Sequence, residues 1–469
     1  MGEAKSYFFV GIGGSGMLPL AMIVRGHGHE VKGSDRSLDQ GRLSAKFEDL
    51  QRQGIALFPQ DGSGITSADQ IVVASGAVED HVPDMVQTRA LGAQRLGRPE
   101  LLAQLFNAAE VRIAVGGTSG KSTVTGMIGW ILHAAGRDPT VMNGAVMKNF
   151  AGPDQPFASA LVGRGPDFVS EVDESDGSIA LYQPDIAVLN NITLDHKSLD
   201  ELRHLFRDFT AKARTVVLNL DDDETRLLAA ALPAEKLRTC SLKDKGADLF
   251  GSEIVEEPYA VSFEANGTPV RLQVPGRHNV ENALAALAAA EAAGVPMAKA
   301  AEALAGFKGL RRRFELIGTA NGISVIDDFG HNPDKIAATL RTLHAFPGRL
   351  LVFFQPHGYA PLRVMGGEFV DMFAKELGPD DVLLMPDPVY YGGTTDMSVG
   401  TSAITEAIEA RGRHAEHIAE APPERGRTTA RLLELAQPGE RIVIMGARDD
   451  TLTLFAEQVL ARLGEAKPT

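Results

Sequence analysis

The segment at residues 116–123 (Gly-Gly-Thr-Ser-Gly-Lys-Ser-Thr) constrains the fold of this chain more than any other. The apolar run 111–115 precedes it, and the helix-forming run 124–132 follows it. This succession predicts a strand, a glycine-rich loop and a helix, the arrangement in which backbone N–H groups and a helix N-terminus bind phosphate. Lys121 can reach the β- and γ-phosphates of a nucleoside triphosphate, and the Ser122 hydroxyl can hold Mg²⁺. The segment therefore predicts a triphosphate site on an α/β domain.

One position departs from the full G-x-x-x-x-G-K-[ST] pattern. Val115 stands where that pattern has its first glycine. From the residues alone, a glycine-rich turn without a ligand therefore stays the alternative to a phosphate site.

Length and composition limit the class of protein. The chain has 469 residues, which corresponds to three domains at ~150 residues each. Its net charge of −15 argues against nucleic acid as the main partner. No apolar run reaches the ~18–20 residues of a membrane span, and the N-terminus enters a predicted strand without a signal peptide. The single cysteine, Cys240, allows no internal disulfide, so we expect a cytoplasmic protein with Cys240 buried in a strand.

Apolar runs and helical patterns alternate along the chain. They predict an alanine-rich packed helix at 280–293 and strands at 6–10, 29–33, 71–75, 168–172, 186–190, 215–219, 323–326, 350–354, 381–385 and 441–445. Strands that alternate with helices predict parallel sheets. We therefore expect an α/β protein of three domains: a Rossmann-like domain at 1–106, a P-loop ATPase-like domain at 107–312 and a second Rossmann-like domain at 313–469.

The first predicted strand leads into a second glycine motif. Gly11, Gly13 and Gly16 fit G-x-G-x-x-G, and Asp35 lies near the spacing of a ribose-binding acid. This fingerprint most often binds NAD(P), and the motif alone does not separate that ligand from another diphosphate, such as a UDP-sugar. Because a separate triphosphate site follows, the two motifs together favour an enzyme in which ATP activates a nucleotide-linked substrate.

Acidic residues follow one of the predicted central strands. Glu171 lies at the end of that strand, where a carboxylate beside a P-loop is well placed for Mg²⁺. A solvated acidic loop is the alternative, and it fits some of Asp173, Glu174 and Asp176. His196 follows another predicted strand and is a second candidate metal ligand, with a capping or core histidine as the alternative.

Together these motifs resemble those of the Mur ligases, the ATP-dependent amide-forming enzymes of peptidoglycan synthesis. The resemblance covers almost the whole chain and is strongest to the alanine-adding branch and to the related ligases that recycle murein tripeptide. The segments that carry it are Gly11-Ile12-Gly13-Gly14-Ser15-Gly16-Met17, Gly33-Ser34-Asp35, Gly117-Thr118-Ser119-Gly120-Lys121-Ser122, Glu171-Val172-Asp173-Glu174-Ser175-Asp176, Asn190-Asn191-Ile192, Pro275-Gly276-Arg277-His278-Asn279-Val280-Glu281-Asn282-Ala283, Arg312-Arg313-Phe314-Glu315, Asp327-Asp328-Phe329-Gly330-His331-Asn332-Pro333 and Phe354-Gln355-Pro356-His357. The shorter Gly-Thr-x-Gly-Lys loop resembles the family's own, so Val115 no longer counts against a phosphate site.

The resemblance implies a role for each matching position. Around a uridine diphosphate it places Gly13, Ser15, Gly16, Met17, Asp35 and Ser75. Around ATP it places Gly117, Thr118, Ser119, Gly120, Lys121, Ser122, Thr123, His278 and Asn282, with Mg²⁺ at Ser122, Glu171 and His196. In the third domain it places Arg313 at the ATP phosphates, Asp327 at the ribose, His331 near the incoming amino acid, and His357 and Arg363 at the substrate.

The implied chemistry needs no protein nucleophile. A carboxylate attacks the γ-phosphate of ATP to give an acyl phosphate, an amine attacks its carbonyl carbon, and phosphate leaves. Positioning and charge neutralisation by Mg²⁺, Lys121 and Arg313 then carry catalysis. The residues expected at the reacting groups are Lys121, His196, Arg313, His331 and Lys212.

Departures from the family pattern concern the amine substrate. The alanine-adding branch usually carries an arginine after the histidine of its Gln-Pro-His segment and another three residues later, where this chain has Gly358 and Pro361. The loss of two cations weakens the case for L-alanine, although Arg363 remains. Lys212 is a surface lysine from the residues alone, and it resembles the carbamylated lysine of other Mur ligases, which the alanine-adding branch generally lacks.

The favoured hypothesis is an ATP-dependent ligase that joins a UDP-N-acetylmuramate-like carboxylate to an amino acid. The alternatives are a Mur-like ligase with other substrates, including one of murein peptide recycling, a nucleotide-binding regulator without turnover, and an NAD(P)-dependent oxidoreductase. The intact P-loop and Glu171 argue against a regulator, and an oxidoreductase leaves the P-loop unexplained.

Overall fold

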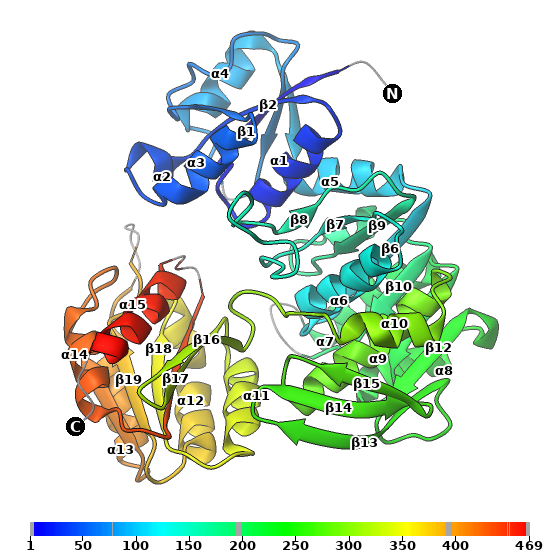
Figure 1. Cartoon of the computed structure of the whole chain (residues 1–469). Coiled ribbons are helices and arrows are strands. Elements are labelled where there is room, and N and C mark those ends of the chain that lie inside the picture. Colours follow the sequence, from blue (N-terminus) through cyan, green and yellow to red (C-terminus); the bar gives the residue numbers. More distant parts are fainter. Residues whose placement is uncertain are drawn as a thin grey trace. The chain divides into compact units, whose positions relative to one another are not determined.

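The computed structural model describes residues 4–76, 78–193, 198–390, 396–447, 449 and 451–465 (Figure 1). The chain divides into two compact units. The first unit holds the chain up to residue 310 except for residues 256–260 and 274–276, which belong with residues 311–469 in the second unit. Each of the two units is built from α/β layers around parallel-rich sheets.

The N-terminal sheet of the first unit is parallel throughout, with strand order β3-β2-β1-β4-β5. Its strands are β1 (Ser6–Val10), β2 (Glu30–Ser34), β3 (Ala56–Phe58), β4 (Ile71–Ala74) and β5 (Gln94–Gly97), and its helices are α1 (Met17–Gly26), α2 (Arg36–Asp39), α3 (Ser44–Arg52), α4 (Pro83–Leu91) and α5 (Arg98–Asn107). Strands β1 and β4 are buried almost throughout, as expected for parallel strands covered on both faces. The strand order reverses between β1 and β4, so the loops after them lie at the switch point where such sheets bind ligands.

The central sheet of the first unit has the order β15-β14-β13-β12-β11-β10-β6-β9-β7-β8. Its strands are β6 (Val111–Gly116), β7 (Thr140–Met142), β8 (Ala160–Leu161), β9 (Asp167–Glu171), β10 (Ile186–Leu189), β11 (Thr215–Asn219), β12 (Leu237–Ser241), β13 (Leu249–Glu257), β14 (Ala260–Ala265) and β15 (Thr268–Leu272). Its helices are α6 (Lys121–Ala134), η1 (Ser178–Leu181), α7 (Leu199–Ala211), α8 (Asp223–Ala230), η2 (Ala234–Lys236), α9 (Arg277–Ala292) and α10 (Met297–Leu304). Parallel neighbours β9, β6 and β10 end at the same edge of the sheet, so the segments that follow them meet there.

The sheet of the second unit has the order β16-β17-β21-β18-β19-β20, parallel except for the edge strand β16. Its strands are β16 (Glu315–Ala320), β17 (Ile323–Asp328), β18 (Leu350–Gln355), β19 (Val382–Pro386), β20 (His414–Ile418) and β21 (Arg441–Gly446). Its helices are α11 (Pro333–His344), α12 (Tyr359–Glu376), α13 (Thr401–Glu409), α14 (Gly426–Leu435) and α15 (Leu452–Glu465). Two apolar clusters lie on its two faces, one with Phe354 and Phe369 and the other with Phe353 and Phe455.

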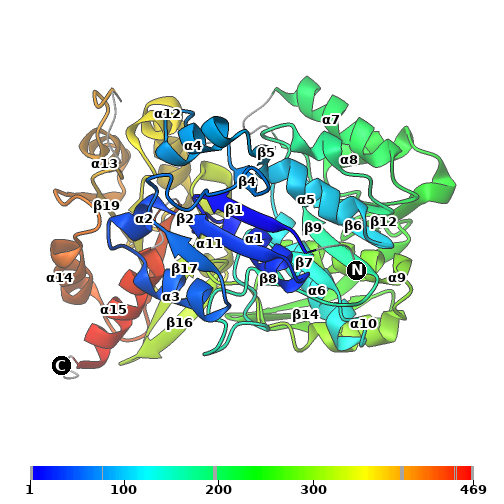
Figure 2. The ribbon, with the colours of Figure 1, turned by 90° about the horizontal axis from the view of Figure 1, so that it is seen from above.

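Within the first unit, the N-terminal domain packs directly on the central sheet. Helix α1 contacts β7 and β8, and α5 contacts β9 and η1 (Figure 2). A Cβ at Gly26, the last residue of α1, would lie 2.6 Å from a methyl carbon of Val162, so the helix end touches the central domain with bare backbone. These contacts place the loop after β1 near the loop after β6.

The predicted elements are confirmed with small shifts in their bounds. The alanine-rich segment is α9, and eleven of its side chains are buried, as a packed helix requires. Cys240 lies in β12 and is buried, and burial raises the pKa of its thiol. The prediction of parallel sheets holds for the N-terminal sheet, but β8, β15 and β16 each pair antiparallel with a neighbour.

Two of these antiparallel pairs are hairpins with a signal in the sequence. The turns are Asn266-Gly267 between β14 and β15 and Asn321-Gly322 between β16 and β17, and all four residues have positive φ. Asn-Gly between strands favours a type I′ hairpin turn. The two strand pairs were therefore readable from the sequence.

Candidate active site

The P-loop is a tight turn between β6 and α6. Gly117 and Gly120 have φ of +116° and +85°, a region that favours glycine. A Cβ at Gly120 would lie 2.5 Å from Asn282 Oδ1, so a larger residue would clash. The loop thus offers bare backbone ahead of a helix N-terminus, the arrangement that binds phosphate.

Asn191, which follows β10, holds this loop, and its neighbour Asn190 contacts Asn282. Asn191 Oδ1 accepts a hydrogen bond from Ser119 N (2.8 Å), and Asn191 Nδ2 donates to Ser119 O (3.1 Å). Asn190 Nδ2 donates to Asn282 Oδ1 (2.7 Å), and Asn282 Nδ2 donates to Asn279 Oδ1. Asn282 is therefore buried beside the loop at Gly120, and its contact with adenine stays a prediction.

Thr118, Thr123 and His278 are the other residues of the first unit that were expected at ATP. Thr118 donates from Oγ1 to Thr193 O (3.1 Å) and accepts from Thr193 N (3.0 Å), which ties the loop to the segment after β10. Thr123 is half-buried in the first turn of α6, and His278 is exposed in the first turn of α9.

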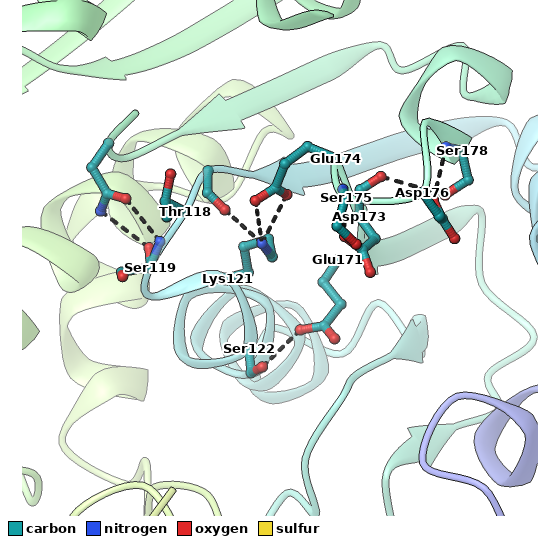
Figure 3. A network of polar contacts seen from close by, with 12 residues as sticks. Thr118, Ser119, Lys121, Ser122, Glu171, Asp173, Glu174, Ser175, Asp176 and Ser178 are labelled. Carbon is teal, nitrogen blue, oxygen red and sulfur yellow. Dashed lines mark hydrogen bonds and ion pairs between the residues drawn. The ribbon is translucent and has the colours of Figure 1, made fainter. Parts of the chain in front are cut away.

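Lys121 bends back over its own loop. Its Nζ donates to Gly117 O (2.7 Å) and to both carboxylate oxygens of Glu174, at 2.9 and 3.2 Å (Figure 3). Glu174 is only 6% exposed, so the solvated-loop interpretation is wrong for this residue, whereas Asp173 and Asp176 are exposed. A buried carboxylate thus holds the P-loop ammonium in this structure.

Ser122 and Glu171 form the second polar contact of the site. Ser122 Oγ donates to Glu171 Oε2 (2.7 Å), from the first turn of α6 to the end of β9 (Figure 3). A Cβ at Gly144 would lie 2.1 Å from Glu171 Oε1, so bare backbone makes room for this carboxylate. The pair fits a Mg²⁺ site, because Mg²⁺ binds through one or two protein oxygens together with substrate phosphates and water. Among the described residues, no group of three His, Cys, Asp or Glu side chains forms a protein-only metal site.

The first glycine motif follows β1 and is organised by Asp35. Gly13 N donates to Asp35 Oδ2 (2.9 Å), and Ser37 N donates to Asp35 Oδ1 (2.7 Å), which also caps α2. Gly11 has φ of +77°. The predicted contact of Asp35 with a ribose stays a prediction, because in this structure the carboxylate holds the loop.

The first glycine loop and Lys121 of the P-loop line one cavity of ≈ 380 Å³ in the first unit. Residues of the N-terminal domain that line it include Gly14, Ser15, Gly16, Met17 and Ser75. Residues of the central domain that line it include Lys121, Gly144, Glu171, Asp173 and Tyr182. A diphosphate at the first loop and a triphosphate at Lys121 would therefore border the same cavity.

Three family profiles match consecutive parts of the chain. They are described as Mur ligase family, catalytic domain (residues 6–110), Mur ligase middle domain (115–290) and Mur ligase, glutamate ligase domain (312–448). The UDP-N-acetylmuramate–L-alanine ligase of Geobacter sp. strain M21 is 34% identical over 481 residues, which cover 99% of each chain. This chain belongs to the Mur ligase family. Like other Mur ligases, it is an ATP-dependent, ADP-forming carboxylate–amine ligase.

Further relatives agree with this assignment. The UDP-N-acetylmuramate–L-alanine ligase of Rhizobium meliloti is 33% identical over 479 residues, 97% of this chain and 96% of that protein. The crystal structure of the UDP-N-acetylmuramate–alanine ligase of Thermotoga maritima matches with a TM-score of 0.79 and 25% identity over 98% of this chain and all of that one. A murein peptide ligase from Psychrobacter arcticus shares the fold, with a TM-score of 0.71 and 24% identity over 99% of this chain and all of that one. In the described part of this Mur ligase, no helix is long and apolar enough to cross a membrane.

In the second unit of this Mur ligase, two adjacent arginines contact one ring. The guanidinium carbons of Arg313 and Arg312 lie 4.6 and 5.1 Å from the centre of the Phe329 ring. Arg312 Nη2 donates to Gly446 O (2.7 Å), so it joins the ends of β17 and β21. The role of Arg313 at the ATP phosphates stays a prediction.

Asp327 is fully buried at the end of β17. It accepts hydrogen bonds from Arg312 Nε (3.3 Å) and Thr453 Oγ1 (2.7 Å). Burial raises the pKa of this carboxyl, and the Arg312 charge offsets only part of that rise. Its contact with a ribose stays a prediction, because the carboxylate is fully buried in this structure.

His331 and His357 lie side by side, with ring centroids 5.5 Å apart. His331 Nδ1 is 3.0 Å from Phe329 O, so the neutral ring carries its proton on Nδ1 and leaves Nε2 as an acceptor. Burial lowers the pKa of His331 to about 3, and the charge of Lys335 adds to this effect. A neutral imidazole is thus available to contact an amine at physiological pH.

The lowered pKa of His331 predicts a loss of stability in mild acid. Between pH 6.5 and 3 the unfolded chain binds this proton and the folded protein does not, so stability falls as the pH falls below 6.5. At pH 5 the expected loss from this group is about 2 kcal/mol. Urea unfolding at pH 7.5 and pH 5 should show a smaller acid loss in His331→Gln than in the unaltered protein. Equal losses of stability in both proteins would contradict the lowered pKa of His331.

The remaining predicted residues are less central in this structure. Arg363 is exposed and pairs with Asp396 (3.3 Å), and His196 lies outside the described residues. Lys212 Nζ donates to Ala180 O (2.6 Å) and Tyr182 O (3.4 Å). A carbamate on Nζ would place an anion beside these two carbonyl oxygens, so carbamylation of Lys212 stays a prediction that these contacts argue against.

Sequence reasoning gave no role to three residues that shape the site of the first unit, nor to one residue of the second unit. Asn191 and Glu174 lie inside segments that carried the family resemblance, and Arg312 is adjacent to the arginine that was singled out. Arg98 lines the cavity at the start of α5, and its signal is a basic residue directly after a strand of the same parallel sheet.

Proposed function

We propose that this Mur ligase activates the carboxylate of a UDP-N-acetylmuramate-like substrate as an acyl phosphate and joins it to an amino acid. The observation that carries the proposal is one cavity lined by the first glycine loop, by Lys121 of the P-loop and by Glu171. The names of the most similar relatives support the same substrate class, since they are UDP-N-acetylmuramate–L-alanine ligases of nearly equal length.

The residues of the first unit divide between the two substrates. The loop from Gly13 to Met17, together with Ser75, would hold the diphosphate of the sugar nucleotide, and residues 117–123 would hold the phosphates of ATP. A carboxylate oxygen would attack the γ-phosphorus, ADP would leave, and the amine would then displace phosphate from the acyl carbon with loss of one amine proton.

Charge neutralisation would be the main catalytic contribution of the protein. Lys121 would leave Glu174 and follow the γ-phosphate, because its ammonium is the cation of the P-loop. Ser122 and Glu171 would hold Mg²⁺, which neutralises charge on the phosphate oxygens when it is bound.

A second candidate concerns the amine. Gly358 caps α12 with φ of +144°, and Pro361 lies in the first turn of that helix, where the alanine-adding branch usually carries arginines. Arg363, in the next turn of α12, pairs with Asp396. This arrangement favours an amine other than L-alanine, for example a larger amino acid or a preformed peptide.

Phosphate release from ATP tests both candidates. The substrates are UDP-N-acetylmuramate or free N-acetylmuramate as the carboxylate, each with single amino acids, with short murein peptides or with no amine. Release that requires UDP-N-acetylmuramate and one amine would support the proposal and identify the amine. No release with any UDP-muramyl compound would contradict it.

A further inference from the structure

Arg98 is the first residue of α5, directly after β5, and it reaches the first glycine loop. A Cβ built on Gly16 would lie 3.1 Å from Arg98 Cδ and 3.3 Å from Arg98 Nη1. The guanidinium therefore lies against bare backbone at the end of the loop, and a side chain at position 16 would displace it. The Arg98 side chain is 22% exposed, so it remains reachable from the cavity.

The cation has one long contact with the central domain. Arg98 Nη2 lies 3.3 Å from Asp176 Oδ2, and the Asp176 side chain is 39% exposed. Asp176 Oδ1 is engaged separately, because it accepts from Ser178 N (2.8 Å). A 3.3 Å contact between partly exposed groups is weaker than the 2.7–2.9 Å contacts typical of charge-assisted hydrogen bonds.

Arg98 is a basic residue of the cavity and lies at the first glycine loop. Among the described residues that line it, Arg98 and Lys121 are the basic ones. Lys121 lies at the P-loop, where Glu174 holds it at 2.9 Å. Arg98 lies beside Gly16, so an anion on the first glycine loop meets this cation.

We propose that Arg98 binds the diphosphate of the carboxylate substrate and exchanges its contact with Asp176 for the phosphate oxygens. The planar fork of a guanidinium matches two phosphate oxygens, which suits this role better than a lysine would. This inference rests on the proposed function, because it assumes that the substrate is linked to a nucleoside diphosphate. It makes Arg98 a substrate-binding residue rather than a structural link between domains.

Binding of UDP to the full-length protein, measured by calorimetry, tests this role. Arg98→Gln is expected to raise the Kd for UDP by roughly 10- to 100-fold, since it removes charge-assisted hydrogen bonds. Arg98→Lys keeps the charge without the fork and should lie between Arg98→Gln and the unaltered protein. The Kd for ADP should stay within about twofold in both variants, because the P-loop is intact. A loss of folded protein would instead weaken the binding of both UDP and ADP.

Two control variants separate binding from a structural role. Arg95→Gln removes a cation of β5 that pairs with Asp80 on the surface, and it should leave the Kd for UDP unchanged. Asp176→Asn removes the competing carboxylate while its Oδ1 can still accept from Ser178, so UDP should bind equally or more tightly. A structural link would instead make Asp176→Asn weaken UDP binding as much as Arg98→Gln does.

The outcomes distinguish this inference from the proposed function. If the unaltered protein binds UDP and both Arg98 variants bind it equally well, the inference is overturned and the proposed substrate stands. If Asp176→Asn weakens UDP binding as much as Arg98→Gln does, the inference is overturned as well. If the unaltered protein binds ADP but not UDP, the proposed substrate fails and the inference fails with it.

Discussion

Replacing Lys121 with methionine is expected to lower kcat/KM for ATP by about 10³-fold, the upper range for loss of one preorganised electrostatic group. Lys121 is the basic residue of the P-loop, and its Nζ already lies 2.7 Å from the loop carbonyl of Gly117. Methionine keeps much of the length of the side chain and removes its charge. Phosphate release in the presence of both substrates measures the effect.

The structure shows that this variant has a second consequence. Methionine leaves Glu174, which is 6% exposed, without the ammonium that both of its oxygens contact. An unpaired buried carboxylate costs about 1–3 kcal/mol of stability, so Lys121→Met should also unfold at lower urea concentration. Lost activity in the single variant is therefore ambiguous between chemistry and folding.

The double variant Lys121→Met/Glu174→Gln resolves this ambiguity. Glutamine removes the unpaired charge, so the double variant should regain most of the stability and none of the activity. Lys245→Met, which neutralises an exposed lysine of the same unit, is the matched control and should behave like the unaltered protein. Activity restored in the double variant would show that Lys121 acts through stability alone.

The elements that the sequence predicted best are those with local signals. Buried parallel strands are continuous apolar runs, and β1, β6, β10 and β18 were located by that pattern to within about two residues. The strand–loop–helix around residues 116–123 was located by its glycine-rich phosphate-binding motif, and Gly117 and Gly120 of that motif have positive φ. The β14–β15 and β16–β17 hairpins also have a local signal, Asn-Gly, that the prediction did not use.

The contacts of the site were harder to predict because they depend on the order of strands in the sheet. Glu171 was placed correctly at a strand end, but its hydrogen bond with Ser122 depends on β9 and β6 being neighbours. The contact of Glu174 with Lys121 joins residues 53 positions apart, and that of Arg98 with Asp176 joins residues 78 apart. No periodicity or spacing within one segment encodes such pairs.

Replacing Glu171 with glutamine is expected to raise the Mg²⁺ concentration needed for half-maximal activity by at least ~10–100-fold. Loss of a residue that only orients a metal ligand already weakens metal binding by that factor, and Glu171 is expected to be a ligand itself. The carboxylate is the one acidic group that contacts Ser122 in this structure's described part, and Mg²⁺ favours anionic oxygen ligands. Glutamine keeps the shape that the bare backbone of Gly144 accommodates, so the fold should be retained. Activity titrated with Mg²⁺ after treatment with EDTA measures the shift, and Glu235→Gln, an exposed carboxylate of the same unit, is the control.

A double-variant cycle with Ser122→Ala decides whether the two side chains act on one cation. If both oxygens hold the same Mg²⁺, removal of either weakens a shared site, and the combined loss is smaller than the sum of the two single losses. If Ser122 and Glu171 act independently, the losses of free energy add. If Glu171→Gln shows the same Mg²⁺ dependence as the unaltered protein, the assignment of Glu171 as a metal ligand is contradicted. The hydrogen bond of 2.7 Å from Ser122 to Glu171 would then be a purely structural contact.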